Sequence, residues 1–293
     1  MRLKYNSFDE IANLAEERKI KISKLAIEDE ALSMGKEESV LFDEMARRFD
    51  VMCESVRAGM DKDQKSMSGL TGGEGYAMHE YAAKNGALCG DFMAGAMARA
   101  LAVAGHNASM GRIVAAPTAG SCGILPGCLV SLYEDRKIPK EDIVMSMFTA
   151  GAVGMVIANK ASLAGAQGGC QAECGSAASM AAAALAELMG GSPGQCADAA
   201  AMAVTAQMGL VCDPVAGLVE IPCIKRNVSG LVIAFSSADM ALAGIKAHIP
   251  MDECVDAMRE VGDAMSPALR ETAVGGLAAT PTGMELRKRV FGE

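Results

Sequence analysis

Three cysteines of this sequence lie in glycine- or proline-containing segments of the kind that connect helices. Cys170 follows Gly168 and Gly169, and Cys212 and Cys223 bracket the segment Asp-Pro-Val-Ala-Gly-Leu-Val-Glu-Ile-Pro. Thiolates select zinc or iron–sulfur clusters. A zinc site needs two closely spaced cysteine pairs, and the ferredoxin spacings are missing. Three cysteines from separate loops could instead bind three irons of a cubane cluster. The fourth iron would then keep an open coordination position and could act as a Lewis acid.

Simple packing is the alternative for these thiols, because a free cysteine is often buried as a small hydrophobe. Cys122 and Cys174 lie in the same loop motifs, and we expect them to line a pocket there. We expect the other five to be core residues: Cys53, Cys89, Cys128, Cys196 and Cys254. Spacing alone leaves both a cluster and ordinary packing open.

A second candidate site is the turn Thr118-Ala119-Gly120-Ser121-Cys122-Gly123, which follows Pro117. Free backbone N–H groups at such a turn, together with the dipole of the helix that follows, suit a carboxylate or a phosphate. A plain connection between two helices is the alternative. Lys160 is the one lysine to consider in the uncharged stretch, but its setting does not indicate a pyridoxal Schiff base. No pyridoxal phosphate is therefore expected.

Composition excludes several classes of protein. The 293 residues carry a net charge of −9 and contain only 4% aromatic residues, which argues against nucleic-acid binding. The hydrophobic share of 51% can form a full core. The charged N-terminal segment has no apolar signal region, so a cytoplasmic location with reduced thiols is expected. The uncharged runs 113–133 and 143–159 are broken by Pro and Gly or are too short for a span, so no membrane contact is expected.

These sites must be positioned by helices, because the long apolar stretches show no alternation typical of strands. Residues 1–66 are charged and are predicted to form outer helices. One begins with a capping box at residues 7–10, with Ile11, Leu14 and Ala15 on one face, and another covers residues 39–58. The predicted buried stripe of the second comprises Val40, Leu41, Met45, Phe49, Met52 and Val56. The glycine-rich segment 66–75 is expected to be mobile or to approach a ligand.

The remainder, residues 86–293, is predicted to form an apolar helical core. The helices expected there cover residues 86–105, 123–132, 141–159, 173–189, 197–208 and 230–246, with an amphipathic surface helix at 251–261. We therefore predict an all-α chain, with one large helical domain over residues 1–293 whose buried central helices surround a metal-cluster site.

At these loops the chain resembles the α chain of the iron–sulfur-dependent L-serine dehydratases. The resemblance is carried by the segments NASMGRIVAAPTAGSCGILPG (107–127), AGAQGGCQAECGSAASMAAAALAEL (164–188), CDPVAGLVEIPCIKRN (212–227) and ALRETAVGGLAATPTG (268–283). The Cys-Asp-Pro and Ile-Pro-Cys-Ile-Lys-Arg-Asn blocks are its most specific parts. The N-terminal helices fit the same family less distinctively.

The resemblance implies a [4Fe-4S] cluster held by Cys170, Cys212 and Cys223, and it implies deamination of L-serine to pyruvate and ammonia. It also implies a separate β chain, because the family's β domain contributes an active-site histidine in a Ser-Ser-His-Thr-type segment that this sequence lacks. The C-terminal cysteine that caps the cluster in single-chain relatives is missing too. Gln167, where relatives often have Glu, and the order Asn159-Lys160 depart from the family pattern.

The sequence-based hypothesis is therefore a carbon–oxygen lyase acting by β-elimination. The serine carboxylate is expected at Thr118, Ala119, Gly120, Ser121 and Gly123. The base is unassigned: Lys160 is the candidate in this chain, and the histidine of the β chain is the other. Two alternatives remain: a cysteine desulfidase-like lyase of the same family, and a non-catalytic iron–sulfur sensor or scaffold subunit. The chain could also form homo-oligomers.

Overall fold

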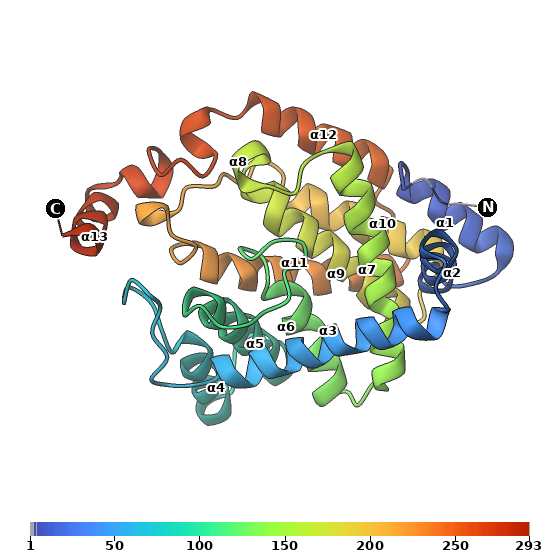
Figure 1. Cartoon of the computed structure of the whole chain (residues 1–293), viewed down its shortest axis with the longest axis horizontal. Coiled ribbons are helices and arrows are strands. Elements are labelled where there is room, and N and C mark those ends of the chain that lie inside the picture. The colour runs from blue at the N-terminus through green and yellow to red at the C-terminus, as the bar shows by residue number, and fades with distance from the viewer. Residues whose placement is uncertain (1–2, 4, 293) are drawn as a thin grey trace.

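The computed structural model describes residues 3 and 5–292, and in this part of the chain every named element is a helix (Figure 1). The one β-type pairing found there is an isolated bridge between Cys212 and Arg270. The all-α prediction is confirmed.

The centre of the fold is α9 (Ser176–Leu188), an alanine-rich helix that is buried along nearly its whole length. It packs against α7 (Lys140–Lys160), α10 (Pro193–Ala206) and α11 (Cys223–Leu242). Alanine side chains allow these helices to approach closely and still exclude water. The predicted buried central helices are thus observed.

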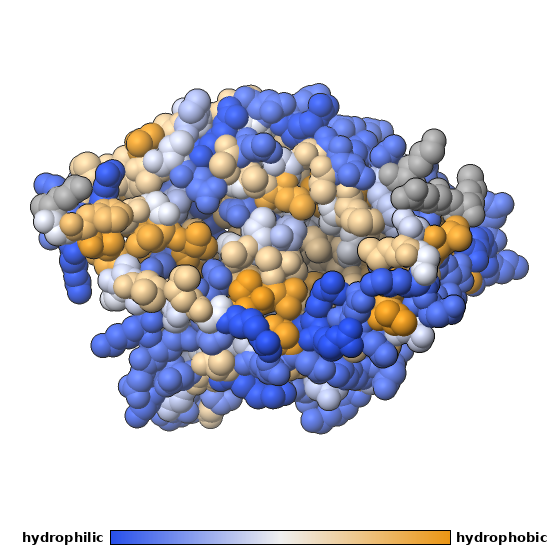
Figure 2. All heavy atoms as spheres, viewed as in Figure 1, coloured by the Kyte–Doolittle hydropathy of each residue, from blue (hydrophilic) through white to orange (hydrophobic). Residues whose placement is uncertain are grey.

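Helix α7 is long and apolar enough to cross a membrane, but 67% of its most apolar stretch is buried inside the fold. This burial is typical of a core helix. Figure 2 shows polar side chains over much of the visible face and apolar side chains gathered around the C-terminal helix α13 (Pro281–Phe291).

The N-terminal helices of the chain precede this central group in the sequence. They comprise α1 (Phe8–Arg18), α2 (Ile22–Met34), α3 (Glu38–Gly59), α4 (Glu74–Asn85) and α5 (Asp91–Ala108). Helix α3 confirms the predicted helix over residues 39–58, and Leu41, Phe49 and Met52 are buried as predicted. Val40 is 43% exposed, so that prediction was wrong. At about 100° per residue, Val40 lies about 140° around the helix from the centre of the stripe formed by Leu41, Phe49, Met52 and Val56, and therefore faces outward.

The remaining apolar stretches also form helices, with shifted ends. Helix α6 (Ile124–Glu134) and α12 (Met251–Ala264) agree with prediction, whereas α11 begins at Cys223 rather than at residue 230. The predicted helix at residue 86 begins only at Asp91. Cys89 therefore lies in the connection before α5 and is exposed, which corrects its prediction as a core residue. The other four predicted core cysteines are buried.

The N-termini of α1 and α12 meet, although 240 residues of sequence separate them. Asp252 accepts hydrogen bonds from the backbone N–H groups of Phe8 (3.0 Å) and Asp9 (3.2 Å), and Asp9 accepts one from the N–H of Asp252 (3.3 Å). The predicted capping box is half formed, because Ser7 accepts from the N–H of Glu10 while its hydroxyl donates to Asp252. Each helix thus supplies a carboxylate to the positive end of the other.

Candidate metal-cluster and substrate site

Cys170 directly precedes a π-helical turn, η1 (Gln171–Gly175), and Cys174 lies within this turn, which leads directly into α9. Their Sγ atoms are 3.4 Å apart. The side chain of Gln171 holds this turn from both ends, because its Oε1 accepts from the N–H of Gly209 (2.8 Å) and its Nε2 donates to the carbonyl of Met258 (2.9 Å). Single π turns inside helices occur frequently at functional sites.

Cys212 is held through its backbone by the C-terminal part of the chain. Its N–H donates to the carbonyl of Leu269 (2.8 Å), and its carbonyl accepts from the N–H of Glu271 (2.7 Å). Cys223 is the first residue of α11. The three predicted ligands therefore come from a π turn, an extended segment and a helix N-terminus.

These three thiols are buried and influence one another. Burial, followed by the nearby Cys170 thiol, raises the pKa of Cys223 to about 12 and also raises the pKa of Cys212. The hydrogen bond with Cys174 lowers the pKa of Cys170 against the opposing effect of burial, and the charge of Arg226 adds to this lowering. In the described part of the chain, no three His, Cys, Asp or Glu side chains form a cage for one metal ion. Cys170 therefore lies close enough to Cys212 and Cys223 to influence the pKa of both thiols, without a preformed site for a single ion among the described residues.

Arg226 supplies positive charge next to these cysteines. Its guanidinium donates to Asp213 Oδ1 (2.8 Å) and to the carbonyl of Val211 (2.8 Å), on either side of Cys212. The second oxygen of Asp213 accepts from the N–H of Leu277 (2.8 Å). A buried ion pair thus joins the Cys212 segment to α11 and to the 3-10 turn η4 (Gly276–Ala279).

Glu173, a residue of the π turn, connects the predicted substrate turn to the predicted ligand Cys212. Thr118 Oγ1 donates to Glu173 Oε1 (2.9 Å), and Glu173 Oε2 lies 3.9 Å from Cys212 Sγ. Burial raises the pKa of the Glu173 carboxyl. Gly165, in the short helix α8 (Gly165–Gly168), completes the contact, since an added Cβ would lie 2.7 Å from Glu173 Oε2 and 3.0 Å from Cys212 Sγ.

Some of the turn's backbone donors are already used. The N–H of Gly123 donates to Asn227 Oδ1 (2.8 Å), and that of Cys122 donates to the carbonyl of Ala119 (3.4 Å). Among the described residues, no hydrogen bond uses the N–H groups of Thr118, Ala119, Gly120 or Ser121. The Cys122 thiol is directed toward the carbonyl of Val103 in α5, whereas the Cys174 thiol contacts Cys170. Of the two cysteines expected to line the pocket, Cys174 is therefore the one that contacts a predicted ligand.

The other residues singled out from the sequence lie away from the thiols. Lys160 Nζ pairs with Asp256 on α12 (3.1 Å), and none of its described contacts reaches Cys170, Cys212 or Cys223. Gln167 is exposed and accepts a hydrogen bond from Ser162. It borders a cavity of about 340 Å³ between α8, the π turn and α12.

Two residues that contact the predicted site, Glu173 and Asn227, were not singled out from the sequence, and neither was Glu220 in the loop between Cys212 and Cys223. Buried Glu220 accepts on one oxygen from the hydroxyls of Ser66 (2.7 Å), Ser68 (2.7 Å) and Thr71 (3.1 Å). The glycine-rich segment 66–75, predicted to be mobile or ligand-bound, is thereby held against the loop that ends at Cys223. Asn227 and Glu220 both lie in the segment 212–227, which carries part of the family resemblance. Membership of that segment is the one feature of the sequence that pointed to them.

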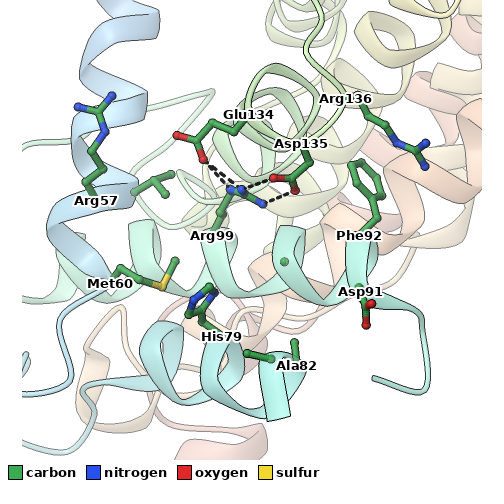
Figure 3. Close-up of a pocket in the computed structure, with 13 residues that line it drawn as sticks. Arg57, Met60, His79, Ala82, Asp91, Phe92, Arg99, Glu134, Asp135 and Arg136 are labelled. Atoms are coloured by element: carbon green, nitrogen blue, oxygen red, sulfur yellow. Dashed lines mark hydrogen bonds and ion pairs between the residues drawn. The ribbon is translucent and has the colours of Figure 1, made fainter. Parts of the chain in front are cut away.

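A cavity of about 860 Å³ lies elsewhere, between α3, α4, α5 and α6 (Figure 3). There, Glu134 and Asp135 bind the Arg99 guanidinium (3.0 and 2.8 Å), and Arg136 stacks over Phe92. None of its lining residues is a predicted cluster ligand or belongs to the predicted substrate turn.

Comparison with known proteins identifies the class to which this fold and site belong. The family model for the serine dehydratase alpha chain matches residues 17–278. The chain is 46% identical over 288 residues to the probable L-serine dehydratase, alpha chain, of Bacillus subtilis, covering 98% of this chain and 96% of that one. It is 44% identical over 283 residues to the L-serine dehydratase, alpha chain, of Peptoniphilus asaccharolyticus, covering 97% of both.

A longer relative, the L-serine dehydratase of Streptomyces coelicolor, is 39% identical over 289 residues, which cover 95% of this chain and 61% of that protein. This chain belongs to the serine dehydratase alpha chain family.

Proposed function

We propose that this chain is the α subunit of an L-serine dehydratase that converts L-serine into pyruvate and ammonia at a [4Fe-4S] cluster. The observation that carries the proposal is the position of Glu173, which contacts both the predicted substrate turn at Thr118 and the predicted ligand Cys212. A bound substrate and a cluster would therefore be neighbours. Family membership supports the reaction.

Cys170, Cys212 and Cys223 fit a cluster by the chemistry of their donors. All three are buried thiols, thiolates are the usual ligands of iron–sulfur clusters, and Arg226 offsets part of their negative charge. When bound, a cluster with one open iron supplies a Lewis acid for the departing hydroxyl of serine. The remaining steps depend on the residues of the chain and its partner.

The turn and Glu173 together suit a zwitterion. The unused N–H groups from Thr118 to Ser121 can donate to the serine carboxylate, which makes the neighbouring α-proton easier to remove. Glu173 lies within hydrogen-bond distance of Thr118 on the same side and can accept from the serine ammonium group. Opposite charges on one small substrate would thus meet complementary groups a few ångströms apart.

We assign removal of the α-proton to a base outside this site's described residues, the histidine of a β chain. Lys160 is the alternative, but its ammonium group is paired with Asp256. The names of the Bacillus subtilis and Peptoniphilus asaccharolyticus relatives, both called alpha chains, support a separate partner chain.

The test is anaerobic reconstitution of the purified chain with iron and sulfide, followed by a pyruvate assay with serine, with and without the β chain. We expect the visible absorbance of a cluster from the wild type and the matched Cys128→Ala variant, whose thiol is buried in α6. Cys212→Ala should lose it. Normal absorbance and activity in Cys212→Ala would refute the ligand assignment.

Parallel assays with threonine and cysteine separate the remaining alternatives. Pyruvate from cysteine in preference to serine would identify a desulfidase-like lyase. A reconstituted complex with full absorbance and no turnover of any of the three would identify a sensor or scaffold subunit.

A further inference from the structure

We infer that Asn227 is a positioning residue that couples the Cys223 end of the metal site to the turn that binds the substrate carboxylate. The inference rests on the proposed function, since it gives Asn227 a role in serine binding. It concerns a residue outside the ligand set and outside the turn itself.

The side chain of Asn227 joins three backbone positions from two distant segments. Its Oδ1 accepts from the N–H of Gly123 (2.8 Å), and its Nδ2 donates to the carbonyls of Gly120 (2.9 Å) and Cys223 (3.0 Å). It is 1% exposed, so water does not compete for these bonds. One amide therefore satisfies a donor and an acceptor of the turn and an acceptor of the cysteine.

The alternatives available to the turn are few. Gly123 lies so close to α5 that an added Cβ would be 2.4 Å from the carbonyl oxygen of Ala100. The turn is thus fixed by α5 on one side and by Asn227 on the other, and Gly120 and Gly123 bracket the unused N–H groups of residues 120 and 121. Any shift of the Asn227 amide must move or unpair the N–H of Gly123 and the carbonyls of Gly120 and Cys223.

The coupling follows from this connection. Binding of metal at Cys223 would fix the first turn of α11 and with it the Cys223 carbonyl. The fixed carbonyl would hold the Asn227 amide in place, and the amide would in turn hold the substrate turn. Serine affinity would then depend on metal loading through Asn227, in addition to any direct contact between substrate and metal.

Asn227→Asp tests this connection, because it preserves the shape and one acceptor but replaces the Nδ2 donor with an acceptor facing the carbonyls of Gly120 and Cys223. In the reconstituted complex with the β chain we expect the KM for serine to rise about tenfold or more, with iron content and absorbance unchanged and kcat within about threefold. The matched control is Gln195→Glu, which removes an amide donor to the carbonyl of Ala241 (2.9 Å) remote from the site. It should leave KM unchanged.

Hydrogen exchange supplies a readout that does not depend on turnover. In the wild type, loading with iron and sulfide should slow exchange in the segment 118–124, and in Asn227→Asp loading should have no such effect. An unchanged KM in Asn227→Asp, an equal rise in Gln195→Glu, or no effect of loading on exchange in the wild type would each overturn the inference. Absence of pyruvate from serine in the wild type would instead overturn the proposed function, while the exchange result would still decide the coupling.

Discussion

The Sγ atom of Cys170, at the start of the π turn, lies 3.4 Å from the Sγ atom of Cys174 within that turn. Only Cys170 belongs to the proposed ligand set. Once Cys170 is bound as a thiolate, the neighbouring Cys174 is the member of the pair that retains a hydrogen to donate. The two cysteines should therefore respond differently to substitution.

Cys170→Ala is expected to abolish iron binding, whereas Cys174→Ala should still be reconstituted. Because hydrogen bonds to ligand sulfurs affect the stability of a cluster, Cys174→Ala should lose its absorbance in air about ten times faster than the wild type. Iron analysis and bleaching kinetics measure both effects. The control is Cys196→Ala, a buried thiol of α10. Loss of iron from Cys174→Ala equal to that from Cys170→Ala would make Cys174 a ligand.

A single methyl group at Gly165 should disturb the site. The added Cβ would lie 2.7 Å from Glu173 Oε2 and 3.0 Å from Cys212 Sγ, so one of these groups must move. We expect Gly165→Ala to lower iron content and to reduce the free energy of unfolding by about 1–3 kcal/mol, the usual cost of overpacking.

Gly151→Ala is the matched control, because Gly151 lies within α7 and an added Cβ there meets nothing within 4 Å. This variant should be stabilised by about 0.5–1 kcal/mol relative to the wild type. Urea unfolding and iron analysis measure both variants. Equal iron content in the two would show that Gly165 tolerates a side chain.

The contact between the N-termini of α1 and α12 predicts a pH dependence of stability. Burial, followed by the hydrogen bond with Asp252, raises the pKa of Asp9 from 3.8 to about 6. Folding thus favours protonated Asp9, and this contribution to stability is complete below the unfolded pKa of 3.8 and is lost as the pH rises through about 6.

Asp9→Asn keeps an acceptor for the N–H of Asp252 and removes the titration. Its free energy of unfolding should exceed that of the wild type at pH 7, and the advantage should shrink toward pH 4. Urea unfolding at a series of pH values measures this difference. A constant difference across the range would mean that Asp9 does not titrate as described.

The buried carboxylate of Glu220 predicts a local effect on the segment 66–71. In Glu220→Ala, the hydroxyls of Ser66, Ser68 and Thr71 lose their shared acceptor, which should cost about 2–4 kcal/mol. Glu220→Gln retains one acceptor oxygen and should cost less. Limited proteolysis and hydrogen exchange should show the segment released in the alanine variant. Protection equal to that of the wild type would mean that the glycine-rich backbone holds itself in place.

Lys160→Ala tests the candidate base of this chain. Because Lys160 and Asp256 form a partly exposed ion pair, the substitution should change stability by about 1 kcal/mol or less. It should leave kcat within a few-fold of the wild type, measured in the complex with the β chain. A fall of about 100-fold or more, the usual effect of losing a general base, would place Lys160 in the reaction.

Sequence patterns predicted the long apolar helices well, because an uncharged run such as that of α9 has few alternatives to burial. They missed α2, α4 and α13, whose mixed polar and apolar residues give weak periodicity, and they started α11 too late because Lys225 and Arg226 resemble loop residues. Such patterns could not predict hydrogen bonds between residues that are far apart in the sequence. Asn227 is 107 residues from Gly120, and Glu220 is 152 residues from Ser68. Only the folded chain shows that these residues are neighbours.

The backbone contacts of Cys212 also set the order in which this protein can mature. Both of its peptide groups are bound by residues 269 and 271, which leave the ribosome well after Cys212 itself. A chain under synthesis can already form α9 and place Cys170, but Cys212 has no fixed position until those later residues emerge. Filling of a site made of all three proposed ligands would therefore have to wait until residues 269–271 have emerged.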